Sequence, residues 1–372
     1  MTTMRIQPGA EALEVDFGDG QHAVLPWIWL RDNAPSAFHP KTHERVFDLL
    51  TADPAAGPAR CEADAEGIRI AWSEDAAPEL LSFDFLIHFG PGRQRPDPAA
   101  ITPALWPAGD ACAEGPSLPR FAAATLEPST PDFHDWLVTT LRHGISIVDG
   151  LPDDTAAGMR LAEAVGFLRR TNFGTTFTVE SKPDPNNSAY TSDALPLHTD
   201  LPNQEVPPGF QFLHCIANAA EGGDSLFADG FAIAAALKAE SPGAFQLLSE
   251  IELPFRFHDQ SDDIRSRYPV IVTDRRGEVT EVRFNAHIVD TIDLPGDLVV
   301  PFYQAYRRLM ALVRSDRFKL AYRLRAGEMV VFDNRRILHG RSAFDPQTGY
   351  RRLEGCYVDR GDFLSRLRKL TG

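Results

Sequence analysis

The feature that most constrains the fold of this chain is a pair of short motifs that lie far apart in the sequence. Residues 197–200 read Leu-His-Thr-Asp, which puts His198 and Asp200 two positions apart. On an extended strand such residues project from the same face, so the imidazole and the carboxylate can bind the same cation. The distant His339 would complete two histidines and one carboxylate, a set that occupies one face of an octahedral iron and leaves the other positions open. If the three side chains share a metal, the fold must bring two distant strands together.

The residue pattern after position 172 is typical of a β-rich fold. Short apolar segments alternate with glycine, proline and asparagine, which predicts short strands. Many short strands with peripheral helices indicate a mainly β fold of the double-stranded β-helix (jelly-roll) type, whose mouth suits a metal pocket. We expect strands near 145–148, 210–216, 226–227, 329–333 and 351–358, and helices near 133–141, 154–169, 230–249 and 299–314.

Three segments of different composition divide the chain. Residues 1–95 form a small β-rich domain, in which alternating apolar and polar residues at 13–25 predict a hairpin. Residues 96–131 are rich in proline, glycine and alanine, so we expect a stiff, extended linker that Trp106 could pin onto a domain. Residues 132–372 form the jelly-roll domain that carries the predicted metal site.

Composition and charge exclude several classes of protein. The formal net charge of −15 disfavours nucleic acid and anionic membranes, because both would repel the chain. No apolar run approaches the ~20 residues of a membrane-spanning helix, and the N-terminus lacks the apolar stretch of a signal peptide, so we expect a cytoplasmic protein. The cysteines, Cys61, Cys112, Cys215 and Cys356, are widely spaced, which indicates reduced thiols rather than a disulfide framework.

A pair of arginines follows the distal histidine. Arg351 and Arg352 open the predicted strand at 351–358. A planar guanidinium binds a carboxylate through two hydrogen bonds, which suits the far carboxylate of 2-oxoglutarate while the other end of that molecule chelates iron. Because a strand turns only one of two neighbouring residues inward, either Arg351 or Arg352 can take this role, but not both.

Blocks in a fixed order along the chain carry a family resemblance. They are Trp-Ile-Trp-Leu-Arg-Asp-Asn at 27–33, Asn-Asn-Ser-Ala-Tyr-Thr at 186–191, the motif at 197–200, Pro-Pro-Gly at 207–209, Leu-His-Cys at 213–215, Gly-Gly-Asp-Ser at 222–225, Asp-Gly-Phe at 229–231, Arg-Phe-Asn at 283–285, Leu-His-Gly-Arg at 338–341 and Gly-Cys-Tyr at 355–357. The chain resembles the γ-butyrobetaine hydroxylase family, dioxygenases that use Fe(II), 2-oxoglutarate and O2 and are related to the taurine dioxygenases. The resemblance implies metal roles for His198, Asp200 and His339 and a 2-oxoglutarate role for Arg351. It also implies hydroxylation of an unactivated carbon, in which the cofactor performs the difficult chemistry.

The first domain departs from this family at a structural zinc site. In the family, Leu-Arg-Asp-Asn leads into closely spaced cysteines that bind zinc with a later histidine, but Ala34 and Ser36 stand where cysteines are expected. His39 and His43 remain, and two histidines without thiolates make a poor structural zinc site. We therefore expect no zinc in this domain.

The resemblance also implies a zwitterionic substrate, because γ-butyrobetaine has a trimethylammonium head and a carboxylate tail. A quaternary ammonium donates no ordinary hydrogen bond and is held by aromatic faces. Carried over from the family, Asn187 matches an asparagine that holds the tail, and Tyr190 matches one wall of the aromatic cage. The cage is altered here, since Phe173 and Phe177 stand in place of a tyrosine and a tryptophan, and Leu201 in place of another tyrosine.

The sequence leaves other substrates and other functions open. Asn285 is a further candidate contact, and so is Arg283, which with Lys182 could supply the extra cation that 2-trimethylaminoethylphosphonate would need. Trimethyllysine would need recognition of an amino-acid end. A non-enzymatic ligand-binding barrel and a zinc hydrolase are alternatives of other classes, because zinc accepts the same three ligands. The family resemblance favours iron and suggests a homodimer.

Overall fold

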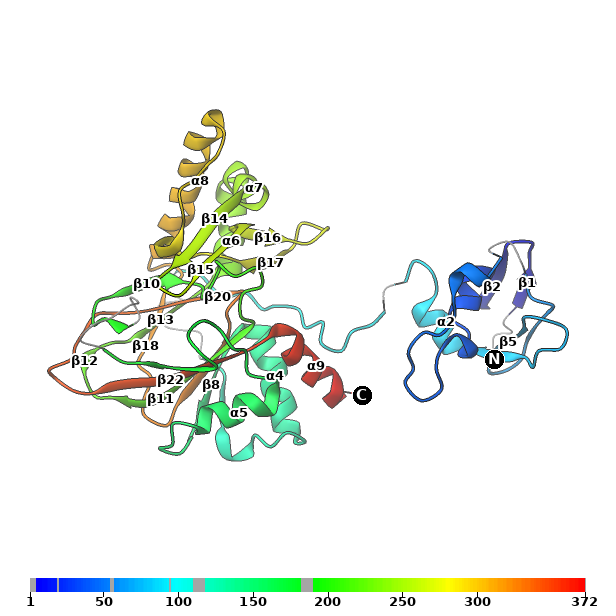
Figure 1. Ribbon diagram of the computed structural model, residues 1–372, viewed down its shortest axis with the longest axis horizontal. Helices are drawn as coiled ribbons and strands as arrows, with labels where there is room; N and C mark the ends of the chain where they lie inside the picture. Colours follow the sequence, from blue (N-terminus) through cyan, green and yellow to red (C-terminus); the bar gives the residue numbers. More distant parts are fainter. Residues whose placement is uncertain are drawn as a thin grey trace. The chain divides into compact units, whose positions relative to one another are not determined.

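A computed structural model of the chain describes residues 5–18, 20–53, 57–93, 95–109, 118–181 and 190–371. The chain divides into two compact units, Met1–Asp97 and Pro98–Gly372, and Figure 1 labels their elements. Each unit has its own hydrophobic core. Among the described residues, no helix combines the length and the apolar character needed to cross a membrane.

The first unit is a small β-rich domain with two antiparallel sheets. One sheet consists of β1 (Arg5–Pro8), β2 (Ala12–Gly18) and β3 (Gln21–Pro26), and the other of β4 (Arg60–Ala63), β5 (Gly67–Ala71) and β6 (Glu79–Ser82). Along β2, Leu13, Val15 and Phe17 are buried, as their alternation with polar residues predicts. Two short helices, α1 (Trp27–Asp32) and α2 (Phe83–Phe89), complete the domain.

The second unit contains two larger sheets that face each other. The first has the strand order β7 (Arg120–Ala122), β8 (Ile145–Asp149), β19 (Met329–Asp333), β11 (Phe210–Asn218), β22 (Arg351–Val358) and β9 (Thr176–Val179). The second has the order β10 (Leu195–His198), β20 (Ile337–Arg341), β13 (Ser225–Asp229) and β18 (Leu320–Tyr322). Buried side chains of both sheets fill the space between them, and the rings of Phe227 and Phe332 lie 5.8 Å apart there. Strands distant in sequence are neighbours, which confirms the predicted jelly roll.

Three helices cover the outer face of the six-stranded sheet: α4 (Pro131–His143), α5 (Ala157–Val165) and α9 (Arg360–Thr371). The Thr130 hydroxyl caps α4 by accepting a hydrogen bond from the Phe133 amide at 3.3 Å. The helix ends where Gly144 takes a left-handed conformation, with φ of 77°. The helix predicted for 154–169 is shorter in the structure, since α5 ends before Gly166, whose backbone is extended.

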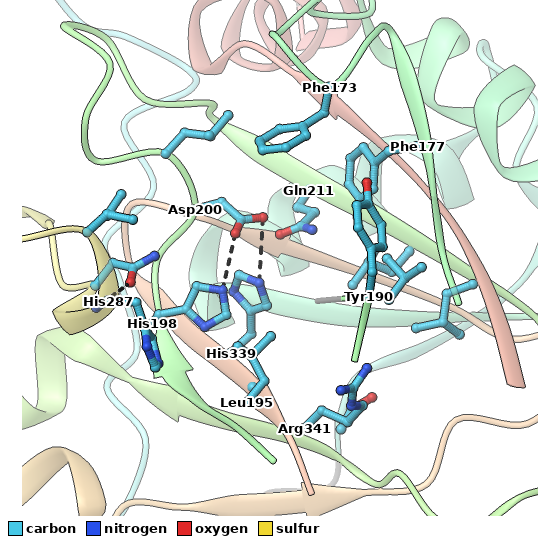
Figure 2. Close-up of a pocket in the computed structure, with 18 of the residues that line it drawn as sticks. Phe173, Phe177, Tyr190, Leu195, His198, Asp200, Gln211, His287, His339 and Arg341 are labelled. Carbon is cyan, nitrogen blue, oxygen red and sulfur yellow. Dashed lines mark hydrogen bonds and ion pairs between the residues drawn. The ribbon is translucent and has the colours of Figure 1, made fainter. Parts of the chain in front are cut away.

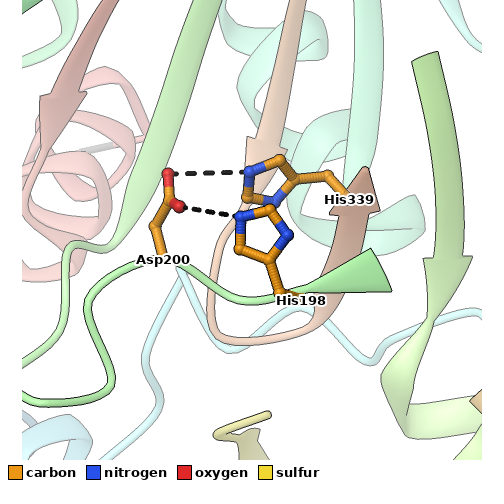
Figure 3. A group of neighbouring side chains, drawn as sticks. All are labelled: His198, Asp200 and His339. Carbon is orange, nitrogen blue, oxygen red and sulfur yellow. Dashed lines mark ion pairs between the residues drawn. The ribbon is translucent and has the colours of Figure 1, made fainter. Parts of the chain in front are cut away.

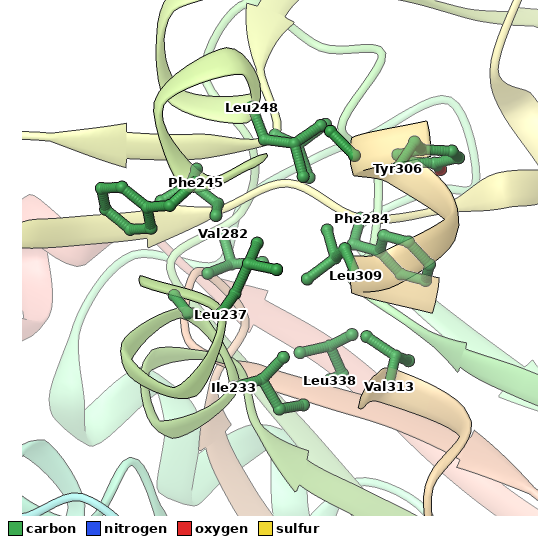
Figure 4. Close-up of a cluster of buried hydrophobic side chains, with 14 of the residues drawn as sticks. Ile233, Leu237, Phe245, Leu248, Val282, Phe284, Tyr306, Leu309, Val313 and Leu338 are labelled. Carbon is green, nitrogen blue, oxygen red and sulfur yellow. The ribbon is translucent and has the colours of Figure 1, made fainter. Parts of the chain in front are cut away.

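An insertion between β13 and β18 forms a further layer, whose apolar core includes side chains of the four-stranded sheet such as Leu338 of β20 (Figure 4). It contains α6 (Gly230–Glu240), α7 (Pro242–Glu250), α8 (Gly296–Arg314) and two hairpins, β14 (Glu252–His258) with β15 (Asp263–Pro269) and β16 (Ile271–Thr273) with β17 (Val279–Val282). The single helix predicted for 230–249 is wrong. Pro242 starts a new helix after Ser241, because proline cannot donate the hydrogen bond that a continuous helix needs.

The segment predicted as a linker, 96–131, is partly built into the second unit. The Trp106 amide donates to the Asp229 carboxylate at 3.0 Å, and its indole N–H donates to the His143 carbonyl at 2.8 Å. Further along, β7 pairs in parallel with β8. The prediction of an extended linker over the whole segment is therefore wrong, because proline-rich sequence can still supply a buried tryptophan and an edge strand.

Candidate metal centre and active site

The three predicted metal ligands converge where the end of β10 pairs with the middle of β20. His198 is the last residue of β10 and lies directly opposite His339 of β20 in the antiparallel pair. Asp200 follows β10, and its carboxylate oxygens lie 3.3 Å from His198 Nε2 and 3.6 Å from His339 Nε2 (Figure 3). One ligand atom from each residue lies within 4.8 Å of the others, and the described ranges contain no second such group. The fold thus satisfies the requirement that the two distant motifs meet.

The protonation states of these side chains suit a metal. The Pro196 carbonyl can only accept, so His198 donates from Nδ1 across 2.9 Å and leaves the Nε2 lone pair free. Burial lowers the pKa of His339 to about 3, so its imidazole is neutral at pH 7. Burial opposes ionisation of Asp200, but the two imidazoles and a hydrogen bond from Tyr357 outweigh it and lower the pKa of this carboxyl. Two imidazoles and one carboxylate are the donor set of a non-haem Fe(II) site.

Two residues that the sequence did not single out hold Asp200 in place. The buried amide of Asn334 accepts from the Asp200 N–H at 2.7 Å and donates to the Asp200 carbonyl at 3.0 Å. The Tyr357 hydroxyl donates to Asp200 Oδ2 at 2.6 Å. Immediately after Asp200 the backbone turns sharply, because Leu201 has a φ of 54°. Tyr357 lies in a block that carried the resemblance, but no local pattern indicates that either side chain reaches Asp200.

A cavity of about 510 Å³ opens on the three ligands (Figure 2). Of the predicted substrate residues, Phe173, Phe177, Tyr190, Leu201 and Asn285 all line it. Asn187 lies outside the described residues. The cavity therefore brings together a metal site and a largely aromatic wall, drawn from segments that are distant in sequence.

The two candidate arginines of β22 point to opposite faces of the strand. Arg351 is almost fully buried and lines the cavity, as do Leu353 and Tyr357 two and six positions later. Its Nε donates to the Gly223 carbonyl at 3.3 Å, and its Nη1 has no hydrogen-bond partner among the described residues. Burial, helped by Arg341, lowers the pKa of Arg351 to about 10, so it stays charged at pH 7. Arg352 points away and pairs with Glu354 at 2.6 Å, so the alternative placement of the 2-oxoglutarate arginine is not supported.

Arg283 does not reach the cavity, contrary to the prediction. Its guanidinium pairs with Glu281 at 2.5 Å and lies over the Tyr268 ring, 3.5 Å from the centroid. Its remaining donors bind the carbonyls of Gln204 and Glu205. The side chain is buried in these structural contacts, and Asn285, two positions further on, lines the cavity instead.

The cavity also contains residues that sequence reasoning missed. Phe257, from hairpin β14–β15, meets Phe173 edge to face with ring centroids 5.5 Å apart. Arg341 donates to the carbonyls of Thr191 and Asp193 at 2.7 and 2.8 Å, which ties the segment after Tyr190 to β20. Asn203, Gln211 and His287 line the cavity as well. Arg341 stood in a matched block, whereas the pattern around Phe257 indicates only a strand.

Comparison with known proteins gives matches over nearly the whole chain. Residues 108–357 match the taurine catabolism dioxygenase TauD, TfdA family, and residues 4–87 match the gamma-butyrobetaine hydroxylase-like N-terminal family. The gamma-butyrobetaine dioxygenase of Pseudomonas sp. (strain AK-1) is 37% identical, with 96% of this chain and 93% of the relative covered. The gamma-butyrobetaine dioxygenase of Homo sapiens is 32% identical, with 97% and 95% covered.

The fold has counterparts among solved structures. An asparagine oxygenase, solved with Fe(II), 3-hydroxyasparagine and succinate, superimposes with a TM-score of 0.51 at 18% identity and covers 64% of this chain and 93% of its own. At that identity the likeness speaks to the jelly roll alone, whereas the sequence matches reach the metal ligands as well. The chain therefore belongs to the taurine catabolism dioxygenase TauD, TfdA family and is an Fe(II)- and 2-oxoglutarate-dependent dioxygenase.

Proposed function

We propose that this dioxygenase hydroxylates a small zwitterion with a quaternary ammonium head, of the γ-butyrobetaine type. The observation that carries the proposal is the aromatic wall of the cavity, which lies directly beside His198, Asp200 and His339. Aromatic faces attract a quaternary ammonium by about 0.5–2 kcal/mol each, whereas most other cations would also demand hydrogen-bond acceptors. The names of the relatives, gamma-butyrobetaine dioxygenases, support the same substrate class.

Different residues of the site would bind the metal, the co-substrate and the substrate. When bound, Fe(II) with 2-oxoglutarate and O2 supplies the oxidation that places a hydroxyl on an unactivated carbon. His198, Asp200 and His339 would hold the metal, and the pairing of β10 with β20 brings the two histidines together before it binds. The charged, buried fork of Arg351 would bind the far carboxylate of 2-oxoglutarate. No side chain is needed as a general acid or base.

The cavity walls would orient the substrate. Phe173, Phe177 and Tyr190 form the aromatic side that would hold the trimethylammonium head. Asn285 is a polar group on the cavity wall that can donate a hydrogen bond to the carboxylate tail. Because both ends of the substrate would be held, the same carbons would always lie near the metal. A rigid cavity would select the hydroxylated position in this way.

One of the two cations proposed to bind a phosphonate substrate, Arg283, does not line the cavity. A phosphonate needs a nearby cation, and Arg283 is occupied by Glu281 and the carbonyls described above. Lys182 lies outside the described residues. The aromatic wall fits any trimethylammonium head, so trimethyllysine and the phosphonate are kept as compounds in the test.

Coupled turnover tests the proposal. Protein loaded with Fe(II) would be given 2-oxoglutarate, O2 and a panel of γ-butyrobetaine, trimethyllysine, 2-trimethylaminoethylphosphonate and a neutral tert-butyl isostere of γ-butyrobetaine. We expect γ-butyrobetaine to stimulate succinate formation most strongly and to gain one oxygen atom by mass spectrometry. Equal stimulation by the neutral isostere, or none by any trimethylammonium compound, would contradict the proposed substrate class.

We also propose that the protein works as a homodimer in the cytoplasm. The family resemblance supports the dimer, and the free cysteines Cys61, Cys215 and Cys356 are compatible with a reducing compartment. Light scattering on the purified full chain tests the first point, since a monomeric mass at micromolar concentration would contradict it. Fractionation of the source cells tests the second.

A further inference from the structure

The two oxygens of the Asp200 carboxylate have different surroundings. Oδ1 faces His198 Nε2 at 3.3 Å, and Oδ2 faces His339 Nε2 at 3.6 Å. Oδ2 accepts a hydrogen bond from the Tyr357 hydroxyl at 2.6 Å, which is a short bond of the charge-assisted kind. An oxygen that already accepts such a bond from a hydroxyl is a poorer metal ligand than an oxygen that does not. The carboxylate is therefore not symmetric before any metal arrives.

Tyr357 is held rigidly where it makes this bond. It lies in β22, paired with Gln211 of β11, and is almost fully buried. Its ring packs against Phe177 with centroids 5.1 Å apart. A hydroxyl fixed by strand pairing and ring packing keeps its direction without losing side-chain entropy when the metal binds. Strand pairing and ring packing therefore fix the position of the hydroxyl independently of its hydrogen bond to Asp200.

The number of free metal positions makes this asymmetry important. An octahedral iron has six positions, and three single-atom protein ligands leave three open. 2-Oxoglutarate would fill two of them, and O2 would need the third. If Asp200 bound through both oxygens, the protein would take four positions, and 2-oxoglutarate would fill the remainder with none left for O2.

We propose that Tyr357 is a positioning residue that makes Asp200 bind the metal through Oδ1 alone, and so keeps one metal position open for O2. This inference rests on the iron site but not on the identity of the organic substrate. It can therefore be tested with no substrate present, and its failure would leave the proposed substrate class untouched.

The matched pair Tyr357→Phe and Tyr306→Phe tests the role of the hydroxyl. Both changes remove one buried hydroxyl and keep the ring, but the Tyr306 hydroxyl has no hydrogen-bond partner among the described residues. Nitric oxide occupies the O2 position of an Fe(II) site and gives an electron paramagnetic resonance signal that can be titrated without turnover. With Fe(II) and 2-oxoglutarate bound, we expect Y357F to bind nitric oxide roughly 10- to 100-fold more weakly than the wild type, and Y306F to match the wild type.

The possible outcomes are separable. Nitric oxide affinity of Y357F within twofold of the wild type would overturn the proposal. Loss of iron from a folded Y357F would also overturn it, because both Asp200 oxygens would then be free to bind more strongly. Thermal unfolding of the metal-free proteins shows whether the variants fold. Should Y357F not fold, a crystal structure of the wild type with Mn(II) decides: one Asp200 oxygen on the metal supports the proposal, and two overturn it.

Discussion

At the scale of single residues, two of the three predicted metal ligands are held by contacts away from their metal-facing atoms. His198 releases Nε2 by donating from Nδ1 to Pro196, and Asn334 holds the backbone of Asp200 from both sides. Such supporting contacts fix the orientation of a ligand before metal binds. Mutation of a metal ligand should therefore affect metal binding differently from mutation of a residue that only supports a ligand.

Removal of Asp200 tests the metal site itself. Asp200→Ala leaves two imidazoles, so we expect the affinity for Fe(II) to fall by more than about 100-fold and coupled turnover to vanish. Equilibrium dialysis with Fe(II) and O2 uptake measure the two effects. Asp297→Ala, which changes an exposed carboxylate in the first turn of α8, serves as the control and should behave like the wild type. Normal activity of D200A would show that the ligand assignment is wrong.

The two arginines of β22 give a sharper comparison. Arg351→Gln removes the charged donor in the cavity, so we expect KM for 2-oxoglutarate to rise roughly 10- to 100-fold, the range for a lost charge-assisted hydrogen bond. Arg352→Gln removes its neighbour on the opposite face and should change KM by less than about twofold. Succinate formation at varied 2-oxoglutarate measures both. The reverse order of effects would move the assignment to Arg352.

At the scale of elements, the insertion between β13 and β18 contributes part of the substrate wall. Hairpin β14–β15 brings Phe257 against Phe173, and the segment after β17 brings Asn285 and His287 to the same cavity. The two sheets supply the metal ligands and Arg351. Part of the cavity wall therefore comes from elements that carry no predicted metal ligand, so that part can change without changing the ligands.

Phe257→Leu tests this division. Leucine is close in size but has no aromatic face, so we expect KM for a trimethylammonium substrate to rise about 2- to 30-fold. KM for 2-oxoglutarate and the Fe(II) affinity should stay within about twofold, because the hairpin carries no ligand for either. Steady-state kinetics with γ-butyrobetaine and its neutral isostere provide the measurement. An equal loss for both compounds would mean that Phe257 only packs.

At the scale of the whole molecule, a buried ion pair joins the segment before β7 to the jelly roll. Arg336 and Asp229 are each 1% exposed in their side chains and are bonded at 2.7 Å. Arg336 also donates to the carbonyls of Ala104 and Arg142, and Asp229 accepts from the Trp106 amide. The pair therefore links residues 104–106, α4, β13 and the start of β20.

Breaking this pair should destabilise the second unit strongly. Asp229→Ala leaves the Arg336 charge buried without its partner, and we expect the free energy of unfolding to fall by about 3–5 kcal/mol. Asp293→Ala breaks the exposed pair with Arg267 and should cost at most about 1 kcal/mol. Urea unfolding of the two variants measures the difference. Equal losses would show that the buried pair does not anchor this segment.

Much of the architecture could be read from the sequence because it is local. Alternation along 13–25, the stop at Gly144 and the short apolar segments after residue 172 predicted strands and helices that the structure contains. Spacing predicted that His198 and Asp200 would meet His339 only if distant strands paired, and the pairing of β10 with β20 brings them together. The break at Pro242 and the packing of 104–106 were missed, because both depend on which residues the rest of the fold buries.

The sequence by itself determined the chemistry that is available: two imidazoles, one carboxylate and an arginine at spacings that strands can align. Only the tertiary structure decided how these groups are used. It points Arg351 into the cavity and Arg352 away from it, turns Arg283 away from the cavity, and places Tyr357, Asn334 and Phe257 around the site. The physical reason is that side-chain periodicity is a local property of the backbone, whereas a hydrogen bond or ring contact between distant residues exists only after two sheets have packed against each other.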